Sequence, residues 1–259
     1  MKKESLIETL NFNDKGVISL MGAGGKTTLM FQLARALQRA GKKVLTTTTT
    51  KIFMPPPSQS ETVILSADGD DLLWQLKTKL QQTDHITAGE CLIQEMDKIS
   101  GFSGETVDQL WQSGLFDWII VEADGAAGKS LKACNATEPV LPSCTGHLVL
   151  VAGLDALGRS LCDDHVHRSL LFSQNSGLPL GHTVDIFHMA RGLAVEMEKI
   201  YFLQPDVFKY VVLNKADTAE LESKGRAIVE LLKPRGTCHG VMVAAFEAKS
   251  PVKKWYDMR

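Results

Sequence analysis

The feature that most constrains this chain is a run of glycines, a lysine and two threonines between a predicted strand and a predicted helix. Residues 16–21 (GVISLM) form a short apolar run that predicts a buried strand. Residues 27–40 carry leucines four positions apart, which predicts a helix with one apolar stripe. Between them lies the run GAGGKTT at 22–28. A strand, a glycine-rich turn and a helix in this order predict an α/β fold with a loop that can cradle phosphate.

The residue types of this loop indicate its chemistry. Glycines permit positive φ and a close approach of the backbone, so successive N–H groups can face phosphate oxygens. The side chain of Lys26 can reach the β and γ phosphates, and the hydroxyl of Thr27 can ligate Mg²⁺. We predict that the nucleotide contacts Gly22, Ala23, Gly24, Gly25, Lys26, Thr27 and Thr28.

The loop departs from the usual pattern GxxxxGK[ST]. That pattern has a glycine five residues before Gly25, and this chain has Leu20 there. An ordinary glycine-rich turn between strand and helix is therefore the alternative interpretation of the same residues.

Short apolar runs continue to alternate with amphipathic stretches along the chain. Strands are expected at residues 44–50, 61–66, 116–121, 147–152, 208–213 and 240–245, strand or hairpin at 86–99, and helices at 68–80, 105–112, 183–203 (capped by Thr183) and 218–232. This alternation predicts a three-layer fold of the P-loop NTPase type, with a mostly parallel sheet and helices on both faces. Since no repeat, linker or change of composition interrupts it, we expect a single domain over residues 1–259, with residues 134–179 as a candidate irregular elaboration.

An acidic turn, Glu122-Ala-Asp-Gly125, follows the predicted strand at 116–121. Ligands bind at the carboxyl ends of strands in open α/β sheets. Glu122 and Asp124 are therefore predicted to hold Mg²⁺ with Thr27 and to act with Lys26 in catalysis, Asp124 alternatively by positioning a water. The N–H of Gly125 is predicted to face the γ phosphate. The simpler alternative is an acidic loop that caps the strand.

A second polar motif, Asn214-Lys-Ala-Asp217, follows the predicted strand at 208–213. The pattern NKxD in this position is how many GTPases select guanine. The Asp carboxylate accepts hydrogen bonds from N1–H and the exocyclic amine, a donor pair that adenine lacks. Asn214, Lys215 and Asp217 are therefore predicted to bind the base, and GTP is favoured over ATP. An accidental turn is the alternative, because Asn and Asp are common turn residues.

Composition limits the partners and the compartment. A formal charge of −2 gives no electrostatic reason to expect nucleic acid or an acidic membrane as a partner. No apolar run reaches the roughly 18–20 residues that span a bilayer, and residues 1–16 lack the apolar centre of a secretory signal. The five cysteines are scattered without a CxxC pair, which favours a reducing cytoplasm.

Three smaller groups of residues have a binding and a structural interpretation. A metal could be held by cysteines and histidines at 134, 144, 147, 162 and 165, although their spacing fits no zinc pattern. His165, His167 and Arg168 could hold a metal or an oxyanion, but a solvated loop or a helix start capped by Asp163 or Asp164 is preferred. The strand end at 46–51 could reach a ligand or be β-branched strand filler.

These motifs, together with residues 46–51, Lys132, Glu138-Pro139, 153–155 and His167-Arg168, resemble the YqeC family. The resemblance runs over residues 16–245, and the segments at 122–142 and 152–161 look most family-like, with Cys134 where proline is expected. Members of this family are described as accessory proteins of selenium-dependent molybdenum hydroxylases. The resemblance implies a role in making or inserting the cofactor of such an enzyme, and a hydroxylase or its cofactor as partner.

The sequence therefore favours a Mg²⁺-dependent, GTP-binding and GTP-hydrolysing accessory factor. One alternative is a P-loop kinase or nucleotidyltransferase acting on a small selenium or molybdenum precursor, although no Arg-rich lid segment is evident. Another is a module that binds nucleotide without chemistry. ATP stays an alternative ligand, and the oligomeric state is not indicated.

Overall fold

A computed structural model gives the fold and describes residues 6–10 and 15–258. Most of the first 16 residues, for which no secretory signal is expected, lie outside the described part. Within that part, no helix combines the length and the hydropathy required to cross a bilayer.

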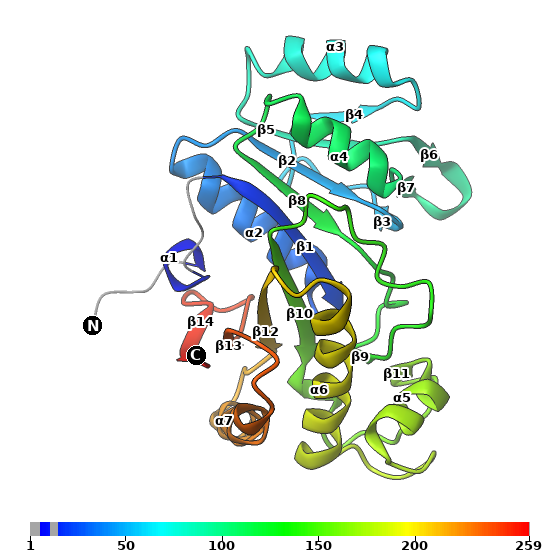
Figure 1. Ribbon diagram of the computed structural model, residues 1–259, viewed down its shortest axis with the longest axis vertical. Helices are drawn as coiled ribbons and strands as arrows, with labels where there is room; N and C mark the ends of the chain where they lie inside the picture. Colours follow the sequence, from blue (N-terminus) through cyan, green and yellow to red (C-terminus); the bar gives the residue numbers. More distant parts are fainter. Residues whose placement is uncertain (1–5, 11–14, 259) are drawn as a thin grey trace.

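The centre of the molecule is a nine-stranded sheet (Figure 1). Its strands, in spatial order, are β14 (Val252–Asp257), β13 (Gly240–Ala244), β12 (Phe208–Asn214), β10 (His147–Gly153), β1 (Gly16–Gly22), β8 (Trp118–Glu122), β2 (Val44–Thr48), β5 (His85–Gly89) and β4 (Val63–Leu65). Every neighbouring pair is parallel except β13 and β14. The predicted α/β fold with a mostly parallel sheet is confirmed, while β14 was not predicted because its edge position leaves it only half-buried.

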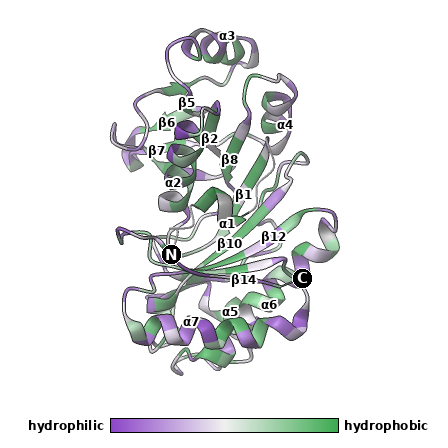
Figure 2. Ribbon diagram, turned by 90° about the vertical axis from the view of Figure 1, so that its left-hand side faces the viewer, coloured by the Kyte–Doolittle hydropathy of each residue, from purple (hydrophilic) through white to green (hydrophobic). Residues whose placement is uncertain are grey.

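Helices cover both faces of this sheet, as predicted. They are α1 (Leu6–Leu10), α2 (Lys26–Arg39), α3 (Gly69–Lys79), α4 (Gly104–Gln112), α5 (Ser169–Ser176), α6 (Ile186–Leu203) and α7 (Ala219–Leu232). The apolar residues of β1 alternate between the two faces: Ile18 and Leu20 pack with α1 and α2, whereas Val17 and Met21 face the side covered by the later helices. Figure 2 shows the apolar strands enclosed between these layers.

Helix starts follow local capping chemistry. Asp68, Ser103 and Thr218 cap α3, α4 and α7 with side-chain oxygens. The expected cap of the long helix, Thr183, is wrong. Asp185 takes that role and accepts from the N–H of His188, so the cap of α6 lies two residues later than expected.

Two small sheets lie beside the main one. The first is antiparallel and contains β3 (Lys51–Phe53), β7 (Lys98–Ser100) and β6 (Cys91–Ile93), which agrees with the hairpin expected near residues 86–99. The second pairs β9 (Leu131–Lys132) with β11 (Val166–His167). Both belong to connections that leave the carboxyl ends of β2, β5, β8 and β10, the edge where the phosphate loop lies.

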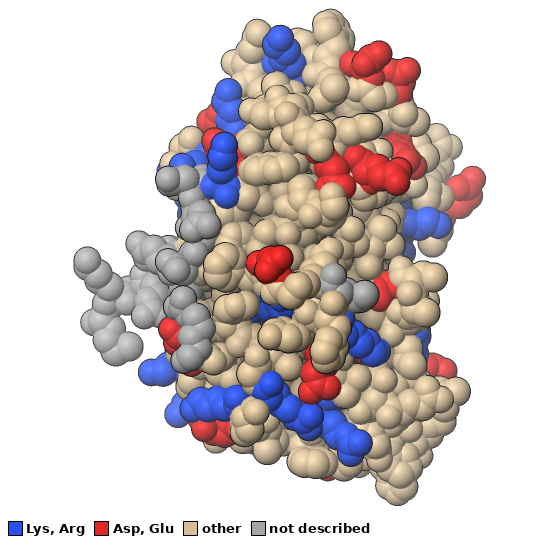
Figure 3. Space-filling view, in the orientation of Figure 1, with Lys and Arg blue, Asp and Glu red and all other residues tan. Residues whose placement is uncertain are grey.

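Charged side chains of both signs are interspersed on the face shown in Figure 3, with Lys and Arg gathered over its lower part. On α7 and the turn after it, Lys224, Arg226, Lys233 and Arg235 each pair with a glutamate. These basic side chains are therefore locally neutralised, in keeping with the net charge of −2.

Candidate functional site: a phosphate loop joined to a buried charge network

The glycine-rich loop is short, because β1 ends at Gly22 and α2 begins at Lys26. Gly25, the residue before the helix, has φ +129°, a conformation that side chains rarely adopt. A Cβ atom on Gly25 would lie 2.4 Å from Nδ2 of Asn214. Glycine is thus required here both by the backbone and by the neighbouring motif at 214–217.

Protein acceptors already bind the first N–H groups of the loop. Those of Gly22, Ala23 and Gly24 donate to the Asp124 carboxylate, the Val151 carbonyl and the Lys129 carbonyl. The first-turn N–H groups of α2 have no partner within the helix, and no side chain caps them. The donors open to phosphate therefore belong to the start of α2, at Lys26, Thr27 and Thr28, where the helix dipole also favours an anion.

Lys26 is buried and folded back over the loop. Its Nζ donates to the Gly22 carbonyl at 2.7 Å and lies 3.0 Å from Asp124 and 3.5 Å from Glu122. Burial opposes the charged amine, but the two carboxylates outweigh this and raise the pKa of Lys26 above its ordinary value. Lys26 is therefore a cation at neutral pH, and its ammonium lies at the loop, where it can bind an anionic group.

Glu122, the last residue of β8, stands beside Thr27. The Thr27 hydroxyl donates to Oε2 of Glu122 at 2.7 Å. Burial raises the pKa of Glu122, and this effect is opposed by Lys26 and by the Thr27 hydrogen bond. A hydroxyl and a carboxylate this close offer two hard oxygen ligands, which suits Mg²⁺.

Asp124 is fully buried and surrounded by donors. Its Oδ2 accepts from the Gly22 N–H at 2.8 Å, from the Cys134 thiol at 3.3 Å, and lies 3.0 Å from Lys132 Nζ. Its Oδ1 faces Lys26 at 3.0 Å. Asp124 thus joins the phosphate loop to Lys132.

The network continues from Lys132 toward α5. Nζ of Lys132 donates to Glu138 at 2.6 Å and to the Gly125 carbonyl at 2.7 Å. The Glu138 carboxylate also accepts hydrogen bonds from both terminal nitrogens of Arg168. Burial works against ionisation of Glu138, but the hydrogen bonds from Arg168 and Lys132 hold its pKa at about 2. Lys132 and Glu138, which only the family resemblance had singled out, are therefore two members of a buried chain of alternating charges.

The same network explains one cluster of metal-ligand types. Within the described part of the chain, one group of three has ligand atoms close together: Asp124, Cys134 and Glu138. The Lys132 ammonium contacts both carboxylates of this group. Burial and the Asp124 charge raise the pKa of Cys134, so its thiol keeps its proton. The Lys132 ammonium therefore already supplies a positive charge to the two carboxylates of this group.

The metal cluster considered for cysteines and histidines at 134–165 does not assemble among the described residues. His147 packs between the rings of Trp118, Phe208 and Tyr210. The expected cap at Asp163 or Asp164 is wrong: α5 begins at Ser169, and the residue before it, Arg168, has a left-handed backbone without a side-chain cap. Asp163 contacts this helix start from a distance of six residues, because it accepts hydrogen bonds from the N–H and hydroxyl of Ser169.

The motif at 214–217 reaches the phosphate loop through Asn214. Its Nδ2 donates to the Gly24 carbonyl at 2.8 Å, and its Oδ1 accepts from the Phe246 N–H at 3.1 Å. Lys215 donates to Ser130 and Asp155. The Asp217 side chain is exposed in the turn before α7. Asn214 supports the loop, and the Asp217 carboxylate is open to solvent.

Threonines 46–49 are used by the fold. Thr46, Thr47 and Thr48 are buried in β2, and their hydroxyls bond to the neighbouring strands β5 and β8. Thr49 donates to the Val140 carbonyl. This agrees with the interpretation of the run as strand residues.

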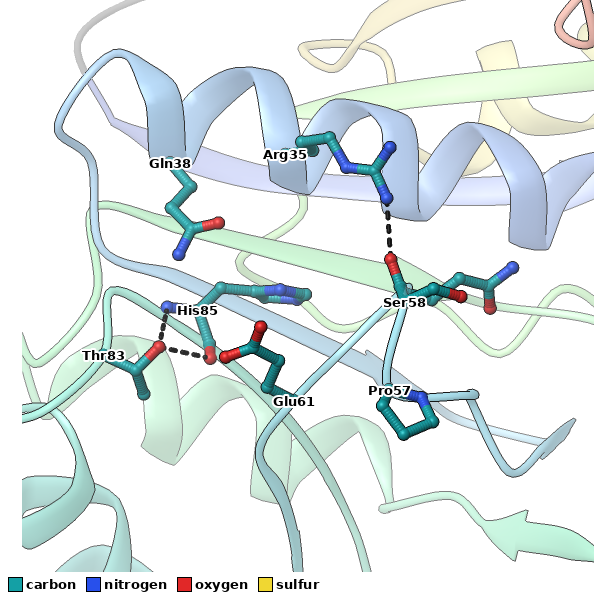
Figure 4. Close-up of a pocket in the computed structure, with 8 residues that line it drawn as sticks. Arg35, Gln38, Pro57, Ser58, Glu61, Thr83 and His85 are labelled. Carbon is teal, nitrogen blue, oxygen red and sulfur yellow. Dashed lines mark hydrogen bonds between the residues drawn. The ribbon is translucent and has the colours of Figure 1, made fainter.

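A cavity of about 570 Å³ opens over the loop. Its walls are residues 24–28, Lys51, Ile52, Phe53, Lys98, Glu122, residues 125–129 and Lys215. A smaller hollow near Arg35, Glu61 and His85 lies at the opposite, amino edge of the strands (Figure 4). Only the first of these two hollows contains the predicted phosphate-binding residues.

A parallel sheet with a glycine-rich loop between its central strand and α2, and with Lys26, Thr27 and Glu122 around that loop, defines an α/β protein of the phosphate-loop class. The chain belongs to the YqeC family: the family model described as "YqeC protein" matches residues 18–170. Its relative in Escherichia coli (strain K12), YqeC, is 36% identical over 171 residues, which are 66% of this chain and 64% of the relative. The match thus spans just under two thirds of that relative, and residues 214–217 lie beyond the range of the family model.

Among solved structures, the chain is similar to chloroplast FtsY from Physcomitrella patens, with a TM-score of 0.46 and 16% identity, covering 100% of this chain and 66% of that one. It is also similar to the cell division protein FtsY from Thermotoga maritima, with a TM-score of 0.42 and 16% identity, covering 97% of this chain and 71% of that one.

Proposed function

We propose that this protein binds a nucleoside triphosphate with Mg²⁺ at the phosphate loop, prefers GTP and hydrolyses it slowly. The observation that carries the proposal is the contact of Lys26 and Thr27, at the start of α2, with Glu122 at the end of β8. A triphosphate placed there would replace Glu122 and Asp124 as partners of Lys26.

The residues divide the work in this proposal. The first-turn N–H groups of α2 and the Lys26 ammonium bind the phosphates. Thr27 and Glu122 hold Mg²⁺, which when bound neutralises charge on the β and γ phosphates. Because Oδ2 of Asp124 is engaged by the Gly22 N–H and by Lys132, we assign to Asp124 the positioning of the loop.

The preference for GTP rests on residues 214–217. Asn214 contacts the phosphate loop, and the exposed Asp217 follows it by three residues in the turn after β12, which supports a contact of Asp217 with the base. There it can accept two hydrogen bonds from guanine. ATP binding would leave that carboxylate without its donor pair.

Calorimetric titration with GTP and with ATP in the presence of Mg²⁺ tests the proposal. We expect GTP to bind at least ~10-fold more tightly, a difference of about 1.4 kcal/mol, and Asp217→Ala to remove that preference. Equal binding of ATP, unchanged in the variant, would contradict the base assignment and favour a kinase or nucleotidyltransferase. Tight GTP binding without hydrolysis would indicate a module that binds nucleotide without chemistry.

The family resemblance supports a biological setting. We propose that the nucleotide cycle serves the maturation of a selenium-dependent molybdenum hydroxylase or its cofactor. The test compares the molybdenum and selenium content and the activity of such a hydroxylase from cells that carry the wild-type chain or a Lys26→Met variant. Equal metal content and equal activity in both would contradict this setting without affecting nucleotide binding.

A further inference from the structure

The cavity over the phosphate loop has one wall formed by Lys51–Phe53 of β3 and Lys98 of β7, here called the β3–β7 wall, and this wall is positively charged. Six ionisable side chains line the cavity: Glu122 and the lysines at positions 26, 51, 98, 129 and 215. Lys26 is paired with Glu122 and Asp124, and Lys215 with Asp155. In the described part of the chain, no carboxylate pairs with Lys51 or Lys98. Lys129, in the segment 125–129, donates to the carbonyl of Asp164. The β3–β7 wall of the cavity therefore carries two lysines that no carboxylate of the described residues pairs with.

Strand alternation places these groups on one face of the small sheet. In β3, Ile52 is buried while Lys51 and Phe53 are exposed, and in β7 Ile99 is buried between Lys98 and Ser100. Phe53 lies directly opposite Lys98 in the antiparallel register. One face of this sheet is thus anchored in the core by isoleucines, and the other presents two lysines and an aromatic ring to the cavity.

Phe53 is exposed and lies beside a cation. Its side chain is 64% exposed, and Nζ of Lys98 lies 4.6 Å from the centre of its ring. A cation over the face of a phenyl ring is attracted to it with a modest gain in free energy. The free face of such a ring is a stacking surface for a flat, unsaturated group.

The β3–β7 wall of the cavity lies near the expected position of the γ phosphate. β8 and β2 lie on one side of β1, and β10, β12 and β13 lie on the other. With the base near residues 214–217 at the end of β12, the triphosphate runs across the loop and its γ end points toward β8 and β2. β3 follows β2 directly, so Lys51 and Phe53 stand beyond the γ end of the proposed nucleotide.

We propose that the β3–β7 wall binds a second ligand, a phosphorylated small molecule with a flat ring, facing the γ phosphate. Lys51 and Lys98 bind its phosphate group, and Phe53 stacks on its ring. This inference rests on the proposed function, because it places the second ligand relative to a nucleotide bound at the loop.

Phenyl phosphate is the probe for this site. The full chain is first saturated with Mg²⁺ and a non-hydrolysable GTP analogue, so the phosphate loop is occupied, and phenyl phosphate or inorganic phosphate is then titrated by calorimetry. We expect one equivalent of phenyl phosphate to bind more tightly than inorganic phosphate. Phe53→Ala should remove that difference.

A double variant tests the lysines. Lys51→Gln with Lys98→Gln should weaken phenyl phosphate at least ~10-fold while the GTP analogue binds as in the wild type. Lys77→Gln with Lys79→Gln, two exposed lysines on α3, is the matched control and should change neither.

Two outcomes would overturn the inference. One is no binding of phenyl phosphate to the analogue-loaded wild type. The other is a loss of analogue binding in the Lys51 and Lys98 variant, which would assign these lysines to the nucleotide itself. Failure of the proposed function is distinguishable, because it would show in the first titration as a wild-type chain that binds no analogue.

Discussion

The Asn214 side chain donates to the carbonyl of Gly24 at 2.8 Å, joining the end of β12 to the phosphate loop. The same side chain accepts from the Phe246 N–H, so it holds together two loops and the turn after β13. Asn214 therefore links the end of β12 to the phosphate loop, whereas the Asp217 side chain is exposed. We propose that these two residues of one short motif have separable roles.

Replacement of Asn214 by alanine should weaken both nucleotides, because the buried Gly24 carbonyl and Phe246 N–H lose their partner. We expect a loss of ~1–3 kcal/mol in unfolding free energy and weaker binding of GTP and ATP alike. Asp217→Ala is the matched variant and should keep wild-type stability while losing only the GTP preference. Urea unfolding and calorimetry measure the two effects. Identical behaviour of the two variants would contradict the division of roles.

Replacement of Thr27 by valine should remove the dependence of nucleotide binding on Mg²⁺. Valine keeps the shape and loses the hydroxyl that contacts Glu122. We expect the Mg²⁺-dependent part of GTP affinity to fall at least ~10-fold, while affinity in EDTA is unchanged. Glu122→Gln should act in the same direction, and Glu90→Gln, outside the cavity, should not. A Thr27→Val chain that still gains affinity from Mg²⁺ would place the metal elsewhere.

Replacement of Lys132 by methionine should destabilise the protein strongly. Asp124 is fully buried and Glu138 largely so, and both would lose the ammonium that lies between them. Breaking a buried ion pair from one side costs ~3–5 kcal/mol. Lys77→Met, an exposed lysine on α3, is the control and should stay within ~0.5 kcal/mol of wild type. Equal stability of the two variants by urea unfolding would show that Lys132 is dispensable to the network.

Acid should destabilise the protein between about pH 6.5 and pH 4 through two buried histidines. Burial lowers the pKa of His147 to about 4, and burial with the nearby Arg35 lowers that of His85 to about 4. Since the unfolded chain binds protons on these residues from about pH 6.5 downward, their contribution is complete above that pH and is lost as the pH falls toward 4. The upper limit is about 3 kcal/mol for each residue.

His147→Gln and His85→Gln should each flatten this pH dependence, measured by urea unfolding at pH 7, 5.5 and 4.5. His182→Gln, an exposed histidine, is the control and should leave the slope unchanged. A slope that persists when both buried histidines are replaced would assign the acid sensitivity to other groups.

The sequence by itself determined the succession of strands and helices along the chain, the place of the glycine-rich loop and the general fold. These depend on local properties: residues 16–21 form a strand and 26–39 a helix because of their own apolar periods, and Asp68 or Thr218 caps the helix that follows it. The unpredicted α5 has little apolar periodicity, and the unpredicted β14 lies at an edge with one paired side.

Only the tertiary structure decided which distant side chains meet. The pairing of Asp124 with Lys132, the contact of Asn214 with Gly24, and the placement of Lys51, Phe53 and Lys98 on one wall depend on strand order and register, which no local pattern encodes. Buried polar groups need partners, and those partners come from whichever segments the sheet brings to its carboxyl edge. For this reason the sequence indicated the phosphate loop, whereas the charge network behind it and the basic wall in front of it became visible only in the fold.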